Sequence, residues 1–557
     1  MHHFKRVATL ILAAGLCLSL LTGCAGKPAV DGIENKLSVC VGAAPVTLDP
    51  IYAEEIADQT VLAHLYENLM RVSVDENGVA SVVGGMAKDV EVVENHDGTV
   101  TYTFKLRNAK WSDGEDVRAE DFVYAWQRLA NPASQSPYAE LLSEVVGYED
   151  ARATGEMKQL QVSAKNTSTL VVTLKGNYDW FLREVCTSPA TMPLRQDVVI
   201  RLKEAAASKA IPKPWWSEVT ELVTNGAYVV KDSGGAALAL GLNAQYYEEQ
   251  NGPSELTFCF ANTAEKAQTL YEEEKVDAIW PLTETRLREL AAEEGWEAVP
   301  ELKTYAVYFN CENEMVSDPA VRQAMSLVID RNALALAAGI TAKAAEGLVP
   351  PGVVENEEGD FRTIGGALLD NTPELYEERC AQAQQLLEDS GYDSGVNLGE
   401  MEYLYIEEGT NGAVAALLCQ QWMDTLQIQV TPRGVTKQEL WTLLRSGEYT
   451  LAGTNITAVG NDAECFLMGW TSGAPNNVVG YESSVYDTLM AIIASAPDGE
   501  ARMGCLHDAE ELLVEDYVLA PLYTKGTAWE LRDTLLGGFR DSRGWFRFSN
   551  VIPKPEV

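Results

Sequence analysis

Basic residues and histidine are scarce in this chain, and their scarcity argues against several functions. Lysine and arginine number 42 against 82 acidic residues, which gives a formal net charge of −40 at pH 7. A surface of that sign repels phosphate backbones, so we expect no binding to nucleic acid. Only three of the five histidines lie beyond residue 23, which argues against a metal site built from imidazoles.

Cysteine pairs with the spacing of zinc ligands are also missing. Eight cysteines follow residue 24, and no two of them lie within four residues of each other, whereas zinc motifs place cysteines in close pairs. We expect mostly free, buried thiols, with a single disulfide as the alternative because an exported chain can meet oxidant. The eight are Cys40, Cys186, Cys259, Cys311, Cys380, Cys419, Cys465 and Cys505.

Catalytic motifs are absent as well. The sequence has no G-x-S-x-G, no H-E-x-x-H and no phosphate-binding loop, so hydrolase and nucleotide chemistry lack their usual residues. Paired carboxylates of the glycosidase kind stay open in so acidic a chain, but no spacing nominates a pair. We therefore expect a protein that is not an enzyme and needs no cofactor or metal, with a surface hydrolase as a lesser alternative.

The N-terminus has the pattern of an export signal. Lys5 and Arg6 precede an apolar run at residues 7–21, which is too short to span a bilayer comfortably and fits the core of a signal peptide at residues 1–23. The ending "LTGC" resembles the bacterial lipobox and implies a lipid on Cys24, with residues 24–36 as a tether. We expect an exported protein anchored by this lipid to the outer face of the cytoplasmic membrane.

Periodic patterns predict an α/β chain with more than one core. A chain of 557 residues exceeds the roughly 250–300 residues that one core supports, so we expect two or three lobes. Alternating apolar residues predict strands at 37–41 and 100–106, and the turn "HDG" at 96–98 predicts a hairpin with residues 90–93. Later segments alternate helices with strands, which indicates α/β lobes.

Helix boundaries are marked by capping residues. Asp318 followed by Pro319 predicts a helix start, because the proline lacks the N–H that would have no partner there. Gly391 predicts the end of the helix before it, since glycine readily adopts the left-handed cap.

The segment "KWSDGEDVRAEDFVYAW", residues 110–126, gathers five carboxylates among large aromatic residues. Asp113 and Gly114 form a turn dipeptide. Glu120 and Asp121 fall in the first turn of a predicted helix, where negative charge complements the helix dipole. Phe122 and Trp126 lie four residues apart on one buried face. We therefore predict local structure here and neither a catalytic pair nor a metal site.

The same segment resembles the signature of a known family, the extracellular solute-binding proteins of family 5, which serve ABC importers and include many oligopeptide-binding members. Nine motifs match in sequence order and cover nearly the whole mature chain. They are "TLDPIYAEEIADQTVLAHLYENL" (47–69), "DGTVTYTFKLR" (97–107), "WSDGEDVRAEDFVYAWQRLANPASQSPYAELL" (111–142), "VTNGAY" (223–228), "LYEEEKVDAIW" (270–280), "TYAVYFN" (304–310), "DPAVRQAMSLVIDR" (318–331), "VPPG" (349–352) and "APLY" (520–523).

The resemblance implies a periplasmic-binding-protein-like α/β fold of the large cluster C type, with two lobes, three domains and a ligand cleft between the lobes. Domain I is expected to be discontinuous and to be interrupted by the other two. The expected segments are 37–66, 195–302 and 520–557 for domain I, 67–194 for domain II and 303–519 for domain III.

The resemblance also implies a function. A monomer would trap an extended oligopeptide between closing lobes and deliver it to an ABC permease and ATPase complex in the membrane. The runner-up is the same mechanism with another solute, such as an oligosaccharide, a metal chelate or haem. A surface receptor or chaperone without a permease is not separated from these by the sequence.

Family positions that contact ligand fall in three parts of this chain. Residues after the "LDP" motif and a tyrosine in "SPYAELL" lie in the first half, and the third part is the strand and loop within residues 453–470. Trp280 and Trp470 are further candidates for the cleft because of their positions in the chain. The predicted ligand-binding residues are Glu54, Glu55, Ile56, Tyr138, Trp280, Asn455, Ile456, Thr457, Ala458, Val459, Asp462 and Trp470.

The third part departs from the family pattern. Peptide-binding members place there an aspartate that holds the peptide's α-ammonium, and here Val459 aligns with it. Ile456 replaces the family tryptophan, and Gly453 replaces an arginine. A buried ammonium needs an acceptor that valine does not supply. Asp462, Glu464, Glu54 or Glu55 could take over this role, and a longer peptide or a non-peptide ligand gains weight.

Overall fold

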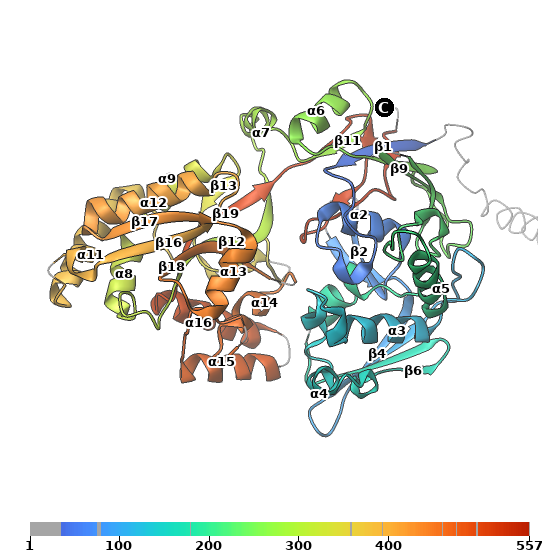
Figure 1. Cartoon of the computed structure of the whole chain (residues 1–557), viewed down its shortest axis with the longest axis horizontal. Coiled ribbons are helices and arrows are strands. Elements are labelled where there is room, and N and C mark those ends of the chain that lie inside the picture. Colours follow the sequence, from blue (N-terminus) through green and yellow to red (C-terminus); the bar gives the residue numbers. More distant parts are fainter. Residues whose placement is uncertain are drawn as a thin grey trace, which may run out of the picture.

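The computed structural model describes residues 35–74, 80–178, 180–234, 236–356, 359–392, 394–458, 460–474, 476–496 and 499–555. These residues form two lobes, which lie side by side in Figure 1. We call the described residues up to 298, together with 528–555, the first lobe, and the described residues within 299–527 the second lobe. The expected signal peptide, Cys24 and Val459 lie outside the described residues.

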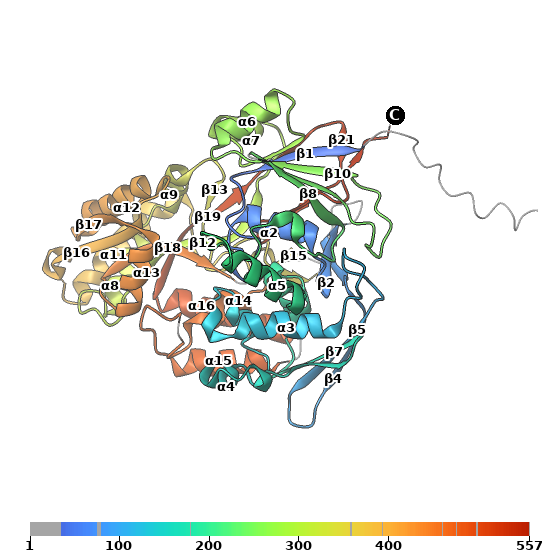
Figure 2. The same cartoon turned by 45° about the vertical axis from the view of Figure 1, so that its right-hand side comes forward.

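A six-stranded sheet in the first lobe joins three distant parts of the chain. β1 pairs parallel with both β10 and β11, which places it in the middle of the sheet (Figure 2). Its residues Leu37, Val39 and Val41 are buried, which confirms the strand predicted at 37–41. The order is β20 (Glu530–Leu531), β11 (Ala278–Trp280), β1 (Lys36–Val41), β10 (Glu255–Cys259), β9 (Ala237–Leu242) and β8 (Tyr228–Gly234).

A second sheet of the first lobe is antiparallel and contains the predicted hairpin. β4 (Ala87–Glu94) pairs with β5 (Val100–Leu106), and Gly98 in the turn has φ +85°. β7 (Thr169–Leu174) and β6 (Val162–Asn166) complete the sheet. The helices of this lobe are α2 (Ile56–Leu65), α3 (Ala119–Ala130), α4 (Tyr148–Thr154), α5 (Gln196–Ala207), α6 (Ala264–Glu272) and α7 (Glu284–Ala291).

The second lobe is built on a mixed six-stranded sheet. β16, β17 and β18 run parallel, and α12 and α13 connect them in sequence. Parallel neighbours need such crossover helices, so the predicted alternation of helices and strands is confirmed here. The order is β13 (Ala342–Ala344), β19 (Leu519–Thr527), β12 (Val299–Phe309), β18 (Leu451–Thr457), β16 (Glu400–Ile406) and β17 (Gln429–Val435).

The predicted helix start at Pro319 is confirmed. The carboxylate of Asp318 accepts the backbone N–H of Ala320 at 2.9 Å, and the helix runs from Pro319 to Leu327. A second cap, Asp330, starts a separate helix. The helices of this lobe are α8 (Pro319–Leu327), α9 (Arg331–Ala338), α10 (Phe361–Gly365), α11 (Tyr376–Asp389), α12 (Asn411–Leu426), α13 (Lys437–Ser446), α14 (Glu464–Leu467), α15 (Ser484–Ser495) and α16 (Glu500–Glu515).

Short strand pairs complete the described structure. Two of them lie in the C-terminal segment, which returns to the first lobe. The predicted helix end is also confirmed, because α11 stops two residues before Gly391, which has φ +85°. The pairs are β2 (Met70–Val74) with β3 (Ala80–Gly84), β14 (Val354–Asn356) with β15 (Gly359–Asp360), β21 (Leu535–Leu536) with β24 (Ile552–Pro553), and β22 (Phe539–Arg540) with β23 (Phe546–Arg547).

The chain enters the second lobe through β12 and leaves it through β19. These strands pair antiparallel from Val299 with Thr527 to Tyr308 with Leu519. At the first-lobe end, the indole N–H of Trp280 donates to Thr527 Oγ1 at 3.0 Å, which joins β11 to the end of β19. The domain boundaries expected at 302/303 and 519/520 fall within this ladder, and the division into domains stays a prediction.

The acidic segment at 110–126 has the local role that the sequence predicts. Asp121 Oδ2 accepts the indole N–H of Trp111 at 3.0 Å and the backbone N–H of Arg118 at 2.9 Å, which caps α3. Phe122 and Trp126 are fully buried. Asp121 therefore fixes the helix start, and Asp113 Oδ1 accepts the backbone N–H of Glu115 at 3.2 Å in the turn.

Two further observations concern the chain as a whole. All eight cysteines in the described part are free, which confirms the expectation of free thiols. No helix among the described residues is long and apolar enough to cross a membrane.

We predict that Asp121→Asn changes the pH dependence of stability. Burial raises the pKa of Asp121 to about 6, against ~3.9 in an unfolded chain. The folded state therefore binds the proton more tightly, and this carboxyl makes wild type less stable as pH rises from about 4 to about 6. The variant lacks that titration. Its free energy of unfolding relative to wild type should rise by roughly 2 kcal/mol between about pH 4.5 and pH 7 in urea titrations.

Glu120→Gln is the matched control, because Glu120 lies in the same helical turn with an exposed side chain. The free energy of unfolding of Glu120→Gln relative to wild type should not rise in this way between about pH 4.5 and pH 7. A difference between Asp121→Asn and wild type that is constant over the pH range would contradict the prediction.

Candidate functional site

A cavity of about 810 Å³ lies between the two lobes. The first lobe supplies three groups of residues, from the start of α2, from the loop before residue 139 and from the C-terminal segment. The second lobe supplies residues from β12, the end of β18 and the start of α13. The main lining residues are Glu54, Glu55, Ile56, Asp58, Gln59, Tyr138, Glu301, Lys303, Lys437, Thr457, Ala458, Arg540, Arg543 and Trp545.

Tyr138 is held in a fixed orientation on the first-lobe wall. Its hydroxyl donates to the carbonyl oxygen of Ala53 at 2.9 Å and accepts from Gln59 Nε2 at 3.0 Å. Gln59 Nε2 also donates to the Ala53 carbonyl at 2.9 Å. Burial raises the pKa of Tyr138 to about 12, so its hydroxyl keeps its proton at neutral pH. The tyrosine therefore offers a rigid ring surface to the cavity.

The first-lobe wall also carries three carboxyl groups. Glu54 and Glu55 precede α2, are exposed and form no ion pair among the described residues. Asp58 is buried and accepts the backbone N–H groups of Val46 at 2.6 Å and Thr47 at 3.3 Å. Burial raises the pKa of Asp58 to about 6 and the nearby negative charge of Glu55 adds to the rise, against the effect of these hydrogen bonds. This wall therefore suits a cationic group of a ligand.

The end of β18 presents an open strand edge on the second lobe. β18 pairs with β12 along the whole of β18, from Thr457 with Lys303 to Leu451 with Phe309. On the other side, β16 pairs only as far as Tyr405 with Gly453, so residues 454–457 have no strand partner there among the described residues. Thr457 and Ala458 reach the cavity. The backbone of this edge is placed where a ligand could pair with it.

Gly453 lies where a side chain has no room. A Cβ atom at this position would lie 1.9 Å from Tyr403 Oη and 2.8 Å from Tyr305 Oη. Two tyrosine side chains thus fill the space that a larger residue would need.

A small recess of about 100 Å³ shares Glu301 and Lys303 with the main cavity. Tyr305 and Tyr523 line it and stack on each other with ring centroids 5.0 Å apart. Lys525 Nζ lies 5.4 Å from the centroid of the Tyr523 ring. The remaining lining residues are Asn411 and Asn455.

Arg540 brings a buried guanidinium to the cavity wall. Its side chain is 4% exposed, and its Nη2 lies 3.7 Å from Glu301 Oε1. Its Nε and Nη1 have no hydrogen-bond partner among the described residues. Burial lowers the pKa of Arg540, whereas the neighbouring carboxylate of Glu301 opposes that change. The guanidinium therefore has two donors that the protein encloses without a partner among the described residues.

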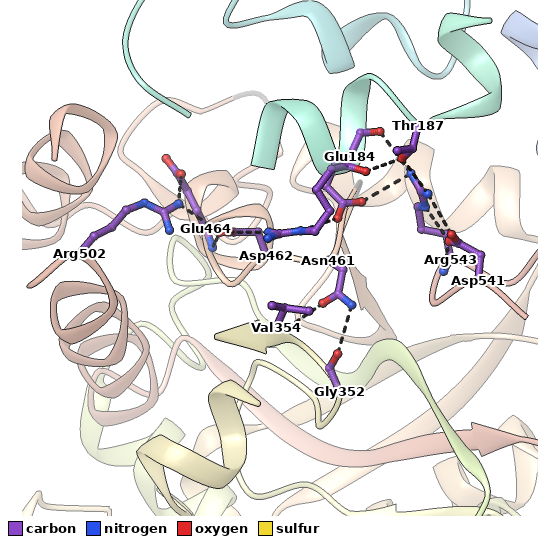
Figure 3. A network of polar contacts seen from close by, with 11 residues as sticks. Glu184, Thr187, Gly352, Val354, Asn461, Asp462, Glu464, Arg502, Asp541 and Arg543 are labelled. Atoms are coloured by element: carbon purple, nitrogen blue, oxygen red, sulfur yellow. Dashed lines mark hydrogen bonds and ion pairs between the residues drawn. The ribbon is translucent and has the colours of Figure 1, made fainter. Parts of the chain in front are cut away.

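A network of ion pairs joins the lobes beside the cavity (Figure 3). Asp462 in the second lobe accepts Arg183 Nη2 of the first lobe at 3.0 Å and Arg502 Nη2 of its own lobe at 3.1 Å. Glu464 accepts Arg502 Nη2 at 2.6 Å and the indole N–H of Trp180 at 3.2 Å. Both acids are thus engaged across the lobe contact.

The predicted ligand residues separate into two groups. The structure brings six of them to the main cavity and Asn455 to the adjoining recess. Ile456 and Trp470 are buried, and Trp470 packs edge-on against Tyr308. Asp462 is held in the ion-pair network, and Trp280 lies at the lobe junction. The six residues at the main cavity are Glu54, Glu55, Ile56, Tyr138, Thr457 and Ala458.

Sequence reasoning missed the cationic residues that line the main cavity and the recess. Lys303 and Lys525 lie on neighbouring strands, and Arg540 comes from the C-terminal segment. The motif "TYAVYFN" begins directly after Lys303, and "APLY" ends two residues before Lys525. The motifs therefore marked the strands, but nothing in them marked the lysines.

Comparisons with known proteins agree with this arrangement. The model of the bacterial extracellular solute-binding proteins, family 5, matches residues 81–478. The probable deoxycholate-binding periplasmic protein YgiS of Escherichia coli is 26% identical over 502 residues, which cover 89% of each chain. The periplasmic oligopeptide-binding protein OppA of Salmonella typhimurium is 26% identical over 535 residues, which cover 92% of each chain.

A solved structure gives the same fold. The crystal structure of Haemophilus influenzae OppA in complex with the peptide RPPGFSPFR has a TM-score of 0.71 and 25% identity. The match covers 94% of this chain and 99% of that one. The family match spans well over half of the sequence. The described residues form two lobes. This chain therefore belongs to the bacterial extracellular solute-binding proteins of family 5.

Proposed function

We propose that the protein binds oligopeptides between its two lobes and delivers them to an ABC importer. The observation that carries the proposal is the open edge of β18 at the cavity, where residues 454–457 lack a strand partner on one side. An extended peptide can add to such an edge through main-chain hydrogen bonds whatever its side chains are. The peptide complex of Haemophilus influenzae OppA supports the same class of ligand.

The carboxylates at the start of α2 complete the proposed peptide site. A peptide α-ammonium that enters the cavity needs an acceptor, and Glu54 and Glu55 are exposed there without an ion pair. Asp462 is less suited to this role, because it already pairs with Arg183 and Arg502. We therefore assign capture of the amine to Glu54 and Glu55, and contact with the peptide backbone to Thr457 and Ala458.

A non-peptide solute is the second candidate. The relative YgiS is named for probable binding of deoxycholate, and its identity to this chain equals that of OppA from Salmonella typhimurium. An acidic amphipathic solute would use the ring of Tyr138 and the cationic side of the cavity, and would leave Glu54 and Glu55 without a role.

We also propose export and anchoring at the cell surface. Residues 1–23 would be removed as a signal peptide, and a lipid on Cys24 would hold a monomer at the outer face of the cytoplasmic membrane, next to the permease and ATPase. The proposal rests on the sequence "LTGC" and on the apolar run before it.

The function is tested by calorimetry with a tetraalanine probe and its N-acetylated form. We expect the free amine to bind and the acetylated form to bind about tenfold or more weakly, because the buried amine loses a charge-assisted hydrogen bond worth about 1.5–3 kcal/mol. Glu54→Gln should weaken the free amine and leave the acetylated form unchanged. Binding of deoxycholate without binding of either peptide would replace the proposed function by the second candidate.

Anchoring is tested by fractionation of cells that express the full chain. We expect wild type in the membrane fraction and Cys24→Ala outside it, since two or three acyl chains hold a protein firmly at a bilayer. Cys40→Ala is the control, because Cys40 is buried in β1 and should not affect anchoring. Release of wild type by high salt would contradict a lipid anchor.

Closure is tested through the ion pair between Arg183 and Asp462. Arg183→Met removes an interlobe ion pair and leaves Asp462 paired with Arg502. We expect a larger radius of gyration of the empty protein in small-angle scattering, and ligand affinity lowered about fivefold for an ion pair worth about 1 kcal/mol. Arg195→Met is the control, because Arg195 pairs with Asp113 and Asp197 inside the first lobe. Equal effects of both variants would remove Arg183 from the closure mechanism.

A further inference from the structure

Cys40 and Cys259 are opposite each other in the six-stranded sheet of the first lobe. They are register partners on the neighbouring parallel strands β1 and β10 (Figure 2). Register partners on neighbouring strands direct their side chains to the same face of a sheet. Both thiols accordingly pack in one small hydrophobic cluster, to which α6 and α7 also contribute. Among the described residues, no other two cysteines are register partners, so this pair is distinct from the remaining thiols.

The spacing of the two strands suits a bond between the sulfur atoms. Neighbouring strands lie about 4.7–4.9 Å apart, and the Cα atoms of a disulfide lie roughly 4.4–6.8 Å apart. The Cβ atoms of a disulfide lie about 3.5–4.5 Å apart, which is closer than the strands, so a bridge between register partners carries strain. Strained bridges are reduced easily. Both thiols are free in this structure, and the pair suits reversible oxidation rather than a permanent bridge.

The two thiols differ in their access to solvent. Cys40 is fully buried, whereas Cys259 is partly exposed. Burial raises the pKa of both thiols, and the neighbouring Asp277 adds to the rise at Cys259. The thiolate is the form that attacks a disulfide, so reaction at neutral pH is slow and needs a reagent that reaches the thiol. Cys259 is therefore the thiol that an oxidant meets first.

We propose that Cys40 and Cys259 form a redox site, which a small-molecule disulfide oxidises to a bridge between β1 and β10. The Cys259 thiolate attacks one sulfur of the reagent, the S–S bond of the reagent breaks, and one small thiolate leaves a mixed disulfide on Cys259. The Cys40 thiolate then attacks the Cys259 sulfur, and the second small thiolate leaves. The protein loses two electrons to the reagent, and the two protons of the protein thiols end on the two small thiols.

The bridge fastens the first strand of the folded chain to the sheet. β1 is the first strand after the tether expected at 24–36, and it lies between β10 and β11. A bond between Cys40 and Cys259 restricts the unfolded chain over the whole interval between them, which stabilises the folded state. The pair is separate from the residues that line the cavity between the lobes. This inference therefore goes beyond the proposed function and does not rest on it.

The test treats the purified, reduced protein with oxidised glutathione at about pH 8, where more thiolate is present than at neutral pH. Remaining thiols are blocked with N-ethylmaleimide, and peptides are mapped by mass spectrometry without reduction. We expect one linked peptide pair that contains Cys40 and Cys259, and we expect dithiothreitol to separate it. The melting temperature should rise by roughly 5 °C on oxidation.

Variants of single cysteines separate the two steps. Cys259→Ser should form no bridge and show no rise in melting temperature on treatment. Cys40→Ser should stop at a mixed disulfide of glutathione with Cys259. Cys311→Ser is the matched control, because Cys311 is also partly exposed but lies in the second lobe, and it should behave as wild type. Circular dichroism checks that each variant is folded.

Several results would overturn the proposal. In one, wild type stays fully reduced or carries only glutathione on Cys259. In another, the bridge forms only after unfolding in urea, which would show that the folded chain keeps the two sulfur atoms apart. A bridge that leaves the melting temperature unchanged would equally exclude the fastening of β1.

Discussion

The antiparallel pairing of β12 with β19 is the constraint on which the rest of the structure depends. Both passages of the chain between the lobes run through this one ladder, from Val299 with Thr527 to Tyr308 with Leu519. The same strands carry Glu301, Lys303 and Lys525 to the recess. A ladder of backbone hydrogen bonds forms the connection, and its register shifts twice, between Pro300 and Thr304 and between Tyr305 and Ala306. The lobe connection and the binding surface are therefore parts of one element.

Charge is distributed unequally around the cavity. The acids Glu54, Glu55 and Asp58 lie together at the start of α2 in the first lobe. Arg540 comes from the C-terminal segment of the same lobe, and Lys303 comes from β12 of the second lobe. A charged ligand would meet acids from one element and bases from two, whereas main-chain pairing with β18 would tolerate any sequence.

The sequence predicted local structure and the family well, and it predicted charge networks poorly. β1, the hairpin with Gly98 and the cap at Asp318 follow from short periodic patterns and from capping residues. The partners of Asp462 are Arg183 and Arg502, which lie 279 and 40 residues away, so no local pattern could show that this acid is already paired. Lys303 and Lys525 line one recess, and Arg540 reaches Glu301 of the same recess, only because the chain returns to the lobe junction.

The two arginines around Asp462 bear on how fast ligands are exchanged. If the lobes separate, Asp462 loses Arg183 but keeps Arg502, which belongs to its own lobe. Opening therefore leaves Asp462 with a counter-charge, and the cost of an isolated ion in a low-dielectric site does not arise for this acid. What opening does break are the interlobe hydrogen bonds from Arg183 to Asp462 and from Trp180 to Glu464. The barrier to releasing a ligand is therefore set by these contacts together with those of the ligand itself.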